Sequence, residues 1–164
     1  MSDAEVLLLL DPEWTGGEDD APPFEAVVGM WPVGPDGEIG RFRGNPEYRP
    51  RFPDSPTDPA DALLRLTAAG EAEPADLLTV LRDATFHLAT NGDGRPLVLP
   101  GPDDGNCVVV TTSPAHRERV PAPGWRLLDL AELATVAGAY DAVVNPGGPA
   151  PARLSAAFLR EAAP

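Results

Sequence analysis

The sequence contains no lysine, one cysteine and two histidines, and each scarcity excludes a class of chemistry. Without lysine, the chain can form neither a lysine Schiff base nor the lysine contact of a phosphate-binding P-loop. With Cys107 alone, it can form no internal disulfide and no zinc site built on cysteines. Cys107 begins the apolar run 107–110, so we interpret it as a buried, inert thiol rather than a nucleophile.

Positive charge is also scarce, because 12 arginines face 26 acidic residues and leave a net charge of −14. A surface this negative repels nucleic-acid phosphates and anionic membranes, so we expect neither as a partner. Two interpretations of the acidity stay open: it serves solubility alone, or it attracts a basic partner.

Long hydrophobic runs are absent from the sequence. The run Val6–Leu10 is far too short to cross a membrane, and the acidic residues before it do not suit a secretory signal peptide. We therefore expect a cytoplasmic protein. The chain has 164 residues, of which 43% are hydrophobic, and this predicts one domain over residues 1–164 with a substantial core.

Residues 1–57 are expected to form an N-terminal extension. Val6–Leu10 predicts a strand. A hairpin is predicted over 24–43, with strands at 24–33 and 38–43 joined by the turn 35–37. Five prolines in 44–59 exclude a helix or a central strand there and predict an extended connection.

Residues 58–164 are expected to form the core of an α/β (α+β) fold, a mixed β-sheet with flanking helices. Asp58 and Pro59 begin one helix, and Pro74 begins a second whose apolar face is expected to run as far as Leu88. Further strands are predicted at 96–99, 107–112, 125–128 and 142–144, with helices capped by Ser113, Asp129 and Ser155.

The sequence carries no motif for phosphate-loop, dinucleotide or serine-hydrolase chemistry. His87 is expected to be a partly buried, hydrogen-bonded side chain on the second helix rather than an acid/base group, and for His116 a solvated turn is expected. Asn91 and Asp93 resemble the start of a calcium loop, but Pro102 stands where a glutamate is required. We therefore predict no catalytic residue, no metal site and no cofactor.

Two polar turns follow predicted strands, at Thr111–Ser113 and Asn145–Gly148. Strand ends are common ligand sites in α/β folds, so these turns could serve a small-molecule sensor or an enzyme. The alternative is that their hydroxyl groups only cap helices.

The most unusual local feature is a cluster of arginines and aromatic residues within the acidic chain. We predict that five of its members form one contiguous binding surface: Trp31, Arg41, Arg43, Tyr48 and Arg49. Guanidinium groups pair with carboxylates and stack on aromatic rings, so the surface would suit a peptide or carboxylate ligand. The alternative is that these arginines clamp the proline-rich segment to the chain's own carboxylates.

Three segments, 94–99 (GRPLVL), 107–114 (CVVVTTSP) and 143–147 (VVNPG), resemble the N-terminal domain of the SseB family. This resemblance spans about residues 74–161. The segments 30–32 (MWP), 45–50 (NPEYRP) and 55–59 (SPTDP) resemble a narrower group of SseB-like proteins associated with type VII secretion in high-GC bacteria. The resemblance implies an SseB-like α/β domain and a non-enzymatic accessory role with a secretion component as partner. It supplies no catalytic residues, and it leaves open whether the chain forms a homo-oligomer.

Overall fold

The computed structural model describes residues 4–17, 19–101 and 105–163. Its internal contacts divide the chain into two compact units, unit 1 (Met1–Val80) and unit 2 (Leu81–Pro164). Each unit is described by itself below. The single domain expected from the chain's length stays a prediction.

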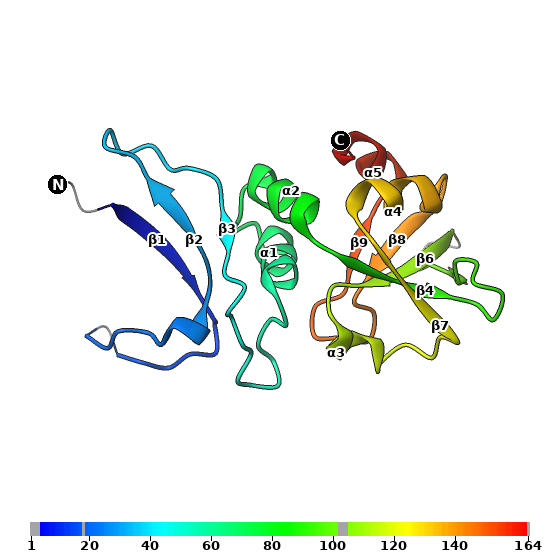
Figure 1. Ribbon diagram of the computed structural model, residues 1–164, viewed down its shortest axis with the longest axis horizontal. Coiled ribbons are helices and arrows are strands. Elements are labelled where there is room, and N and C mark those ends of the chain that lie inside the picture. Colours follow the sequence, from blue (N-terminus) through cyan, green and yellow to red (C-terminus); the bar gives the residue numbers. More distant parts are fainter. Residues whose placement is uncertain (1–3, 18, 102–104, 164) are drawn as a thin grey trace. The chain divides into compact units, whose positions relative to one another are not determined.

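Unit 1 is built on a three-stranded antiparallel sheet in the order β1-β2-β3 (Figure 1). The strands are β1 (Glu5–Leu10), β2 (Val27–Val33) and β3 (Arg43–Gly44), and the short 3₁₀ helix η1 (Phe24–Ala26) leads into β2. In the register, Leu7 lies opposite Trp31 and Met30 lies opposite Arg43. The expected N-terminal antiparallel hairpin is therefore present.

The returning strand predicted over 38–43 is wrong in extent. Only an isolated bridge between Val33 and Ile39 and the two residues of β3 pair with β2. The carbonyl oxygen of Pro32 accepts the Gly40 N–H at 2.7 Å, but Pro32 has no N–H to donate on the same side. The ladder is interrupted at this point.

Two helices follow in unit 1. Helix α1 (Pro59–Ala68) begins at Asp58 as predicted, because the Asp58 carboxylate accepts the N–H of Asp61 at 3.0 Å. Helix α2 (Pro74–Asp83) crosses the boundary between the units. The predicted continuation of its apolar face to Leu88 is wrong, because residues 86–90 form a strand.

Unit 2 contains a six-stranded mixed sheet with flanking helices, which confirms the predicted fold class (Figure 1). The strand order is β7-β4-β6-β8-β9, and β5 pairs with the first half of β6. Only the β6–β8 pair is parallel among the pairings described. The elements are β4 (Phe86–Thr90), β5 (Val98–Pro100), β6 (Asn106–Thr111), α3 (Pro114–Arg117), β7 (Gly124–Leu128), α4 (Leu130–Ala137), β8 (Asp141–Val144), β9 (Ala152–Leu154) and α5 (Ala156–Ala162).

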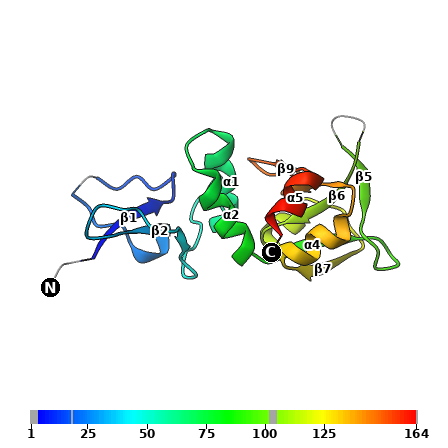
Figure 2. The same ribbon diagram turned by 90° about the horizontal axis from the view of Figure 1, so that it is seen from above.

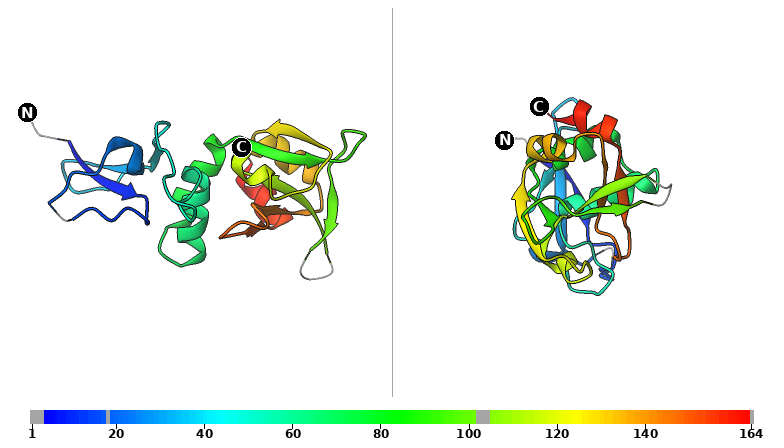
Figure 3. Two further views of the ribbon diagram at one scale, coloured as in Figure 1. Left: turned by 90° about the horizontal axis from the view of Figure 1, so that it is seen from below. Right: turned by 90° about the vertical axis from the view of Figure 1, so that its right-hand side faces the viewer.

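Strand β4, which lies inside the sheet of unit 2, is buried on both faces. Leu88 and Ala89 are adjacent in β4 and point to opposite faces, yet both are fully buried. Helices α4 and α5 pack against each other beside the sheet (Figure 2). On the face of Ala89, a second cluster contains Val109 and Val120. Strand β5, whose three residues are exposed, lies at the periphery of the unit (Figures 2 and 3).

Helix starts in unit 2 follow the sequence closely. Asp129 and Glu132 form a reciprocal capping box at α4, and the Ser155 hydroxyl accepts the N–H of Phe158 at α5. Ser113 is the N-cap residue of α3, as predicted, but its side chain makes no capping hydrogen bond. Strand β9 was not expected. The sequence also predicts a turn over 102–105 between the expected strands 96–99 and 107–112, and this turn lies largely outside the described residues.

Among the described residues, no helix combines the length and the apolar character needed to span a bilayer.

Candidate functional site

The five residues of the predicted binding surface lie in unit 1 in three different environments. Trp31 lies on β2 and is half-buried. Its indole N–H donates to Asp76 Oδ2 at 3.0 Å, and its ring lies 4.9 Å from that of Phe42, tilted by 59°. Gly29 makes room for the Phe42 ring, because a Cβ atom there would lie 2.2 Å from Phe42 Cζ. Trp31 is thus held by the fold of its own unit.

Tyr48 belongs to the interior of unit 1, which corrects its assignment to a surface. It is 4% exposed, and its hydroxyl lies 2.7 Å from the Pro56 carbonyl oxygen and 3.3 Å from Asp11 Oδ2. Burial, followed by the charge of Asp11, raises the pKa of Tyr48 well above its usual range. Asp11 also accepts the Ser55 hydroxyl at 2.6 Å. No local sequence pattern indicates this network, because its hydrogen-bonded pairs are up to 44 residues apart.

The proline-rich segment that follows β3 is fixed by hydrogen bonds. Asn45 donates its backbone N–H to Val28, and its side-chain amide to the carbonyl oxygens of Phe24 and Val27. The Arg49 N–H donates to the Glu25 carbonyl at 2.9 Å. These hydrogen bonds attach the proline-rich segment to η1 and β2 of unit 1.

The three arginines of the predicted surface behave differently from one another. Arg49 folds back and donates to the carbonyl oxygens of Pro46 and Tyr48, at 3.1 and 2.8 Å. Arg41 and Arg43 are exposed, and neither forms an ion pair with any carboxylate among the described residues. The five residues therefore do not form one contiguous surface. Only the guanidinium groups of Arg41 and Arg43 are left accessible.

The two polar turns of unit 2 are brought together at the carboxyl ends of the parallel strands β6 and β8. The Asn145 Oδ1 atom accepts the Thr112 N–H at 2.9 Å, and Asn145 Nδ2 donates to Thr112 Oγ1 at 3.0 Å. Asn145 is 1% exposed and has a φ of 53°, in the left-handed region. Its side chain is thus used to tie the two strand ends to each other.

Both histidines lie in unit 2, and both predicted environments are corrected. His87 lies on strand β4 opposite Thr111, not on a helix. Burial, followed by the charge of Arg117, lowers its pKa. His116, expected in a solvated turn, is 1% exposed, and its Nδ1 lies 3.1 Å from Arg119 Nη1.

The chemistry available at these strand ends is limited. Two buried polar atoms, His87 Nδ1 and Ser113 Oγ, have no hydrogen-bond partner within the described part of the chain, and they are not bonded to each other. Cys107 is buried and 1% exposed, as expected. No group of three or more histidine, cysteine, aspartate or glutamate side chains in the described ranges could hold a metal ion.

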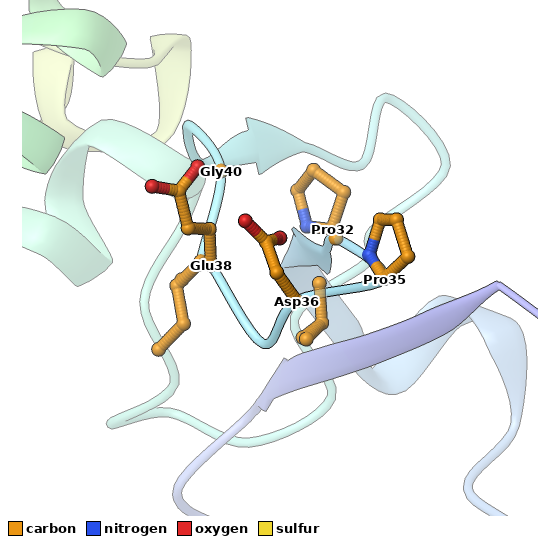
Figure 4. Close-up of a pocket in the computed structure, with 8 residues that line it drawn as sticks. Pro32, Pro35, Asp36, Glu38 and Gly40 are labelled. Carbon is orange, nitrogen blue, oxygen red and sulfur yellow. The ribbon is translucent and has the colours of Figure 1, made fainter.

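A shallow hollow of about 370 Å³ lies at the turn that follows β2 (Figure 4). The rings of Pro32 and Pro35 line it together with Ile39, and Asp36 and Glu38 contribute carboxylates. Ile39 is 61% exposed. The hollow combines apolar contact with negative charge on one exposed turn.

Comparisons with known proteins identify no relative. The chain matches no protein-family model, no curated protein and no solved structure.

Proposed function

We propose that this chain is a non-enzymatic, cytoplasmic accessory protein that binds a protein component of type VII secretion through unit 1. The resemblance of residues 30–59 to secretion-associated SseB-like proteins supports the choice of partner. The observation that carries the binding role is the accessibility of Arg41 and Arg43.

Unit 1 contains 17 acidic residues and five arginines, so its sequence offers many carboxylates with which Arg41 and Arg43 could pair. Arg65 is an example of an arginine in this unit that pairs internally. Its guanidinium lies 2.9 Å from Asp61 Oδ2 and donates to the Asp54 carbonyl oxygen at 2.6 Å. Arg41 and Arg43 have no such contacts with the described residues. Two exposed guanidinium groups can each bind a carboxylate of a partner in a bidentate manner.

The alternative role, a small-molecule sensor or enzyme at the polar strand ends of unit 2, has less support. Asn145 and Thr112 direct their polar groups at each other rather than at a ligand. Ser113 Oγ is not hydrogen-bonded to a base in the described residues, as an activated nucleophile would be.

The proposed function is tested with the charge-reversed variant Arg41→Glu/Arg43→Glu. The immobilised full chain is exposed to a lysate of a high-GC bacterium that expresses a type VII system, and retained proteins are quantified by mass spectrometry. We expect the wild type to enrich a secretion component and the variant to lose about tenfold or more of that enrichment, with an unchanged melting temperature.

The matched control is Arg126→Glu/Arg160→Glu, which makes the same charge change at two exposed arginines of unit 2. It should retain the partner. Failure of the wild type to enrich any secretion component, or equal loss in both double variants, would contradict the proposal.

A further inference from the structure

Strand β1 is an open edge of the sheet in unit 1. It pairs with β2 on one side, and no described strand pairs with its other side. Val6, Leu7 and Leu8 are 42, 47 and 45% exposed. Because adjacent residues of a strand point to opposite faces, β1 exposes aliphatic side chains on both faces as well as free backbone groups at its edge.

Proteins usually protect such an edge with lysine, proline, an inward-pointing charge or a bulge. Within β1, only Glu5 is charged, and the register shift between Leu9 and Leu10 lies at the far end of the strand. Residues 6–9 therefore form an unprotected apolar edge. An edge of this kind is a template for one further strand.

The charges around β1 indicate which kind of strand fits. Glu5 lies in the strand itself, opposite Val33, and Asp36 and Glu38 follow on the next turn beside the hollow of Figure 4. The arginines of residues 41–51 come after this turn, and Arg43 lies on β3 at the opposite edge of the sheet. The β1 edge is thus apolar and carries negative charge at its Glu5 end.

A second copy of this chain is a poor occupant of the edge. Unit 1 has a net charge of −12 from its 17 acidic residues and five arginines, so two copies paired through β1 would bring like charges together. An extended segment with positive charges has the complementary charge. Its backbone would form hydrogen bonds with the free groups at the edge of β1. Its alternate side chains would contact the exposed aliphatic side chains of β1.

We propose that β1 is a docking site for an extended, apolar segment of another protein that is flanked by lysine or arginine and adds to the sheet as a fourth strand. This site goes beyond the proposed function and is separate from Arg41 and Arg43, which lie toward the other edge.

The probe is the peptide acetyl-Arg-Val-Thr-Val-Thr-Val-Arg-amide, and its control has glutamate in place of both arginines. Binding to the full chain is measured by calorimetry, and amide hydrogen exchange is followed at residues 5–10. We expect the arginine peptide to bind at least about tenfold more tightly than the glutamate peptide and to slow exchange within β1.

The single variants Leu7→Lys and Leu8→Lys place a protective charge on opposite faces of β1, and each should weaken peptide binding about tenfold or more. The matched control is Leu127→Lys, at a 61% exposed leucine on the edge strand β7 of unit 2, and it should bind like the wild type. Circular dichroism identifies any variant that has failed to fold.

Three results would overturn the proposal: no slowing of exchange at residues 5–10, equal affinity for both peptides, or a dimer in which β1 is already protected without peptide. The Arg41→Glu/Arg43→Glu variant should still bind the peptide. Failure of the secretion-partner proposal can therefore be distinguished from failure of this one.

Discussion

The sheets of the two units differ in how completely they are covered. In unit 2, strand β6 is paired along both sides, and apolar clusters lie on both faces of the sheet. In unit 1, the outer strand β1 is nearly half exposed and has one free edge. The difference indicates that unit 2 satisfies its own packing, whereas unit 1 leaves apolar and polar groups available to other molecules.

The charges are divided just as unequally. Unit 1 has a net charge of −12, whereas unit 2 has nine acidic residues and seven arginines and a net charge of −2. Most of the chain's acidity therefore belongs to the unit with the open edge. Negative charge keeps an exposed apolar edge from pairing with copies of itself, so the acidity and the open strand are compatible features of one surface.

The largest expected effect on stability is the difference between truncating a buried leucine of unit 2 and truncating a partly exposed leucine of β1. Leu88→Ala removes a side chain that is fully buried in the centre of unit 2 and should lower the free energy of unfolding by about 2–5 kcal/mol. Leu8→Ala in β1 removes the same atoms from a side chain that is 45% exposed and should cost less than about 1 kcal/mol. Native-state hydrogen exchange reports each unit separately. Equal costs would show that β1 is covered in solution.

A smaller effect is expected from Tyr48→Phe, which leaves the Pro56 carbonyl without its hydroxyl partner and should cost unit 1 about 1–3 kcal/mol. Because the folded pKa of Tyr48 is raised, the wild type should lose stability as the pH rises above about 10, where the unfolded tyrosine ionises. The variant should lack this component of the alkaline loss. Tyr140→Phe, at a tyrosine that is 42% exposed in unit 2, is the control and should change stability little.

The smallest effect is expected at acidic pH and in unit 2. Asp141 accepts the Ala156 N–H at 2.8 Å and the Arg153 Nε–H at 2.8 Å, and these contacts lower its pKa. Its contribution is present above the unfolded value of about 4 and is lost as the pH falls through the lower folded pKa.

Asp141→Asn should therefore make thermal unfolding of unit 2 less dependent on pH below about 4. The matched control is Asp83→Asn, which makes the same substitution at an exposed carboxylate. An Asp141 variant with the wild-type acid profile would show that these two hydrogen bonds do not govern acid stability. Unit 1 is thus expected to respond to alkali through Tyr48, and unit 2 to acid through Asp141.

Local signals in the sequence were sufficient for the helix starts and for the fold class. Asp58, Asp129 and Ser155 cap helices because the side-chain oxygen of each accepts the backbone N–H of the residue three positions later. This relation is purely local. In contrast, the spacing of Leu77, Leu81 and Leu88 led to a wrong prediction, a helix that continues as far as Leu88. Leu88 continues the helical period by coincidence, and only its pairing with Val110 and Arg126 reveals the strand.

The candidate site was less predictable, because its outcome depends on contacts between distant residues. Arg49 and Arg41 look equivalent in the sequence, but only Arg49 finds carbonyl acceptors within its own loop. Tyr48 is buried because Asp11 and Pro56 happen to converge on it. The free edge of β1 depends on the sheet order of unit 1, in which no described strand pairs with the outer side of β1, and no local sequence pattern encodes that order.

The central position of β6 has a consequence for synthesis on the ribosome. Its partners β4 and β5 precede it in the chain, whereas the residue opposite Cys107 in the parallel partner β8 is Asp141, 34 residues later. During that interval of translation, the backbone edge of the valine-rich strand β6 that will pair with β8 stays open. Nascent unit 2 therefore passes through a state with an open strand edge like that of β1, and an open edge of this kind favours aggregation.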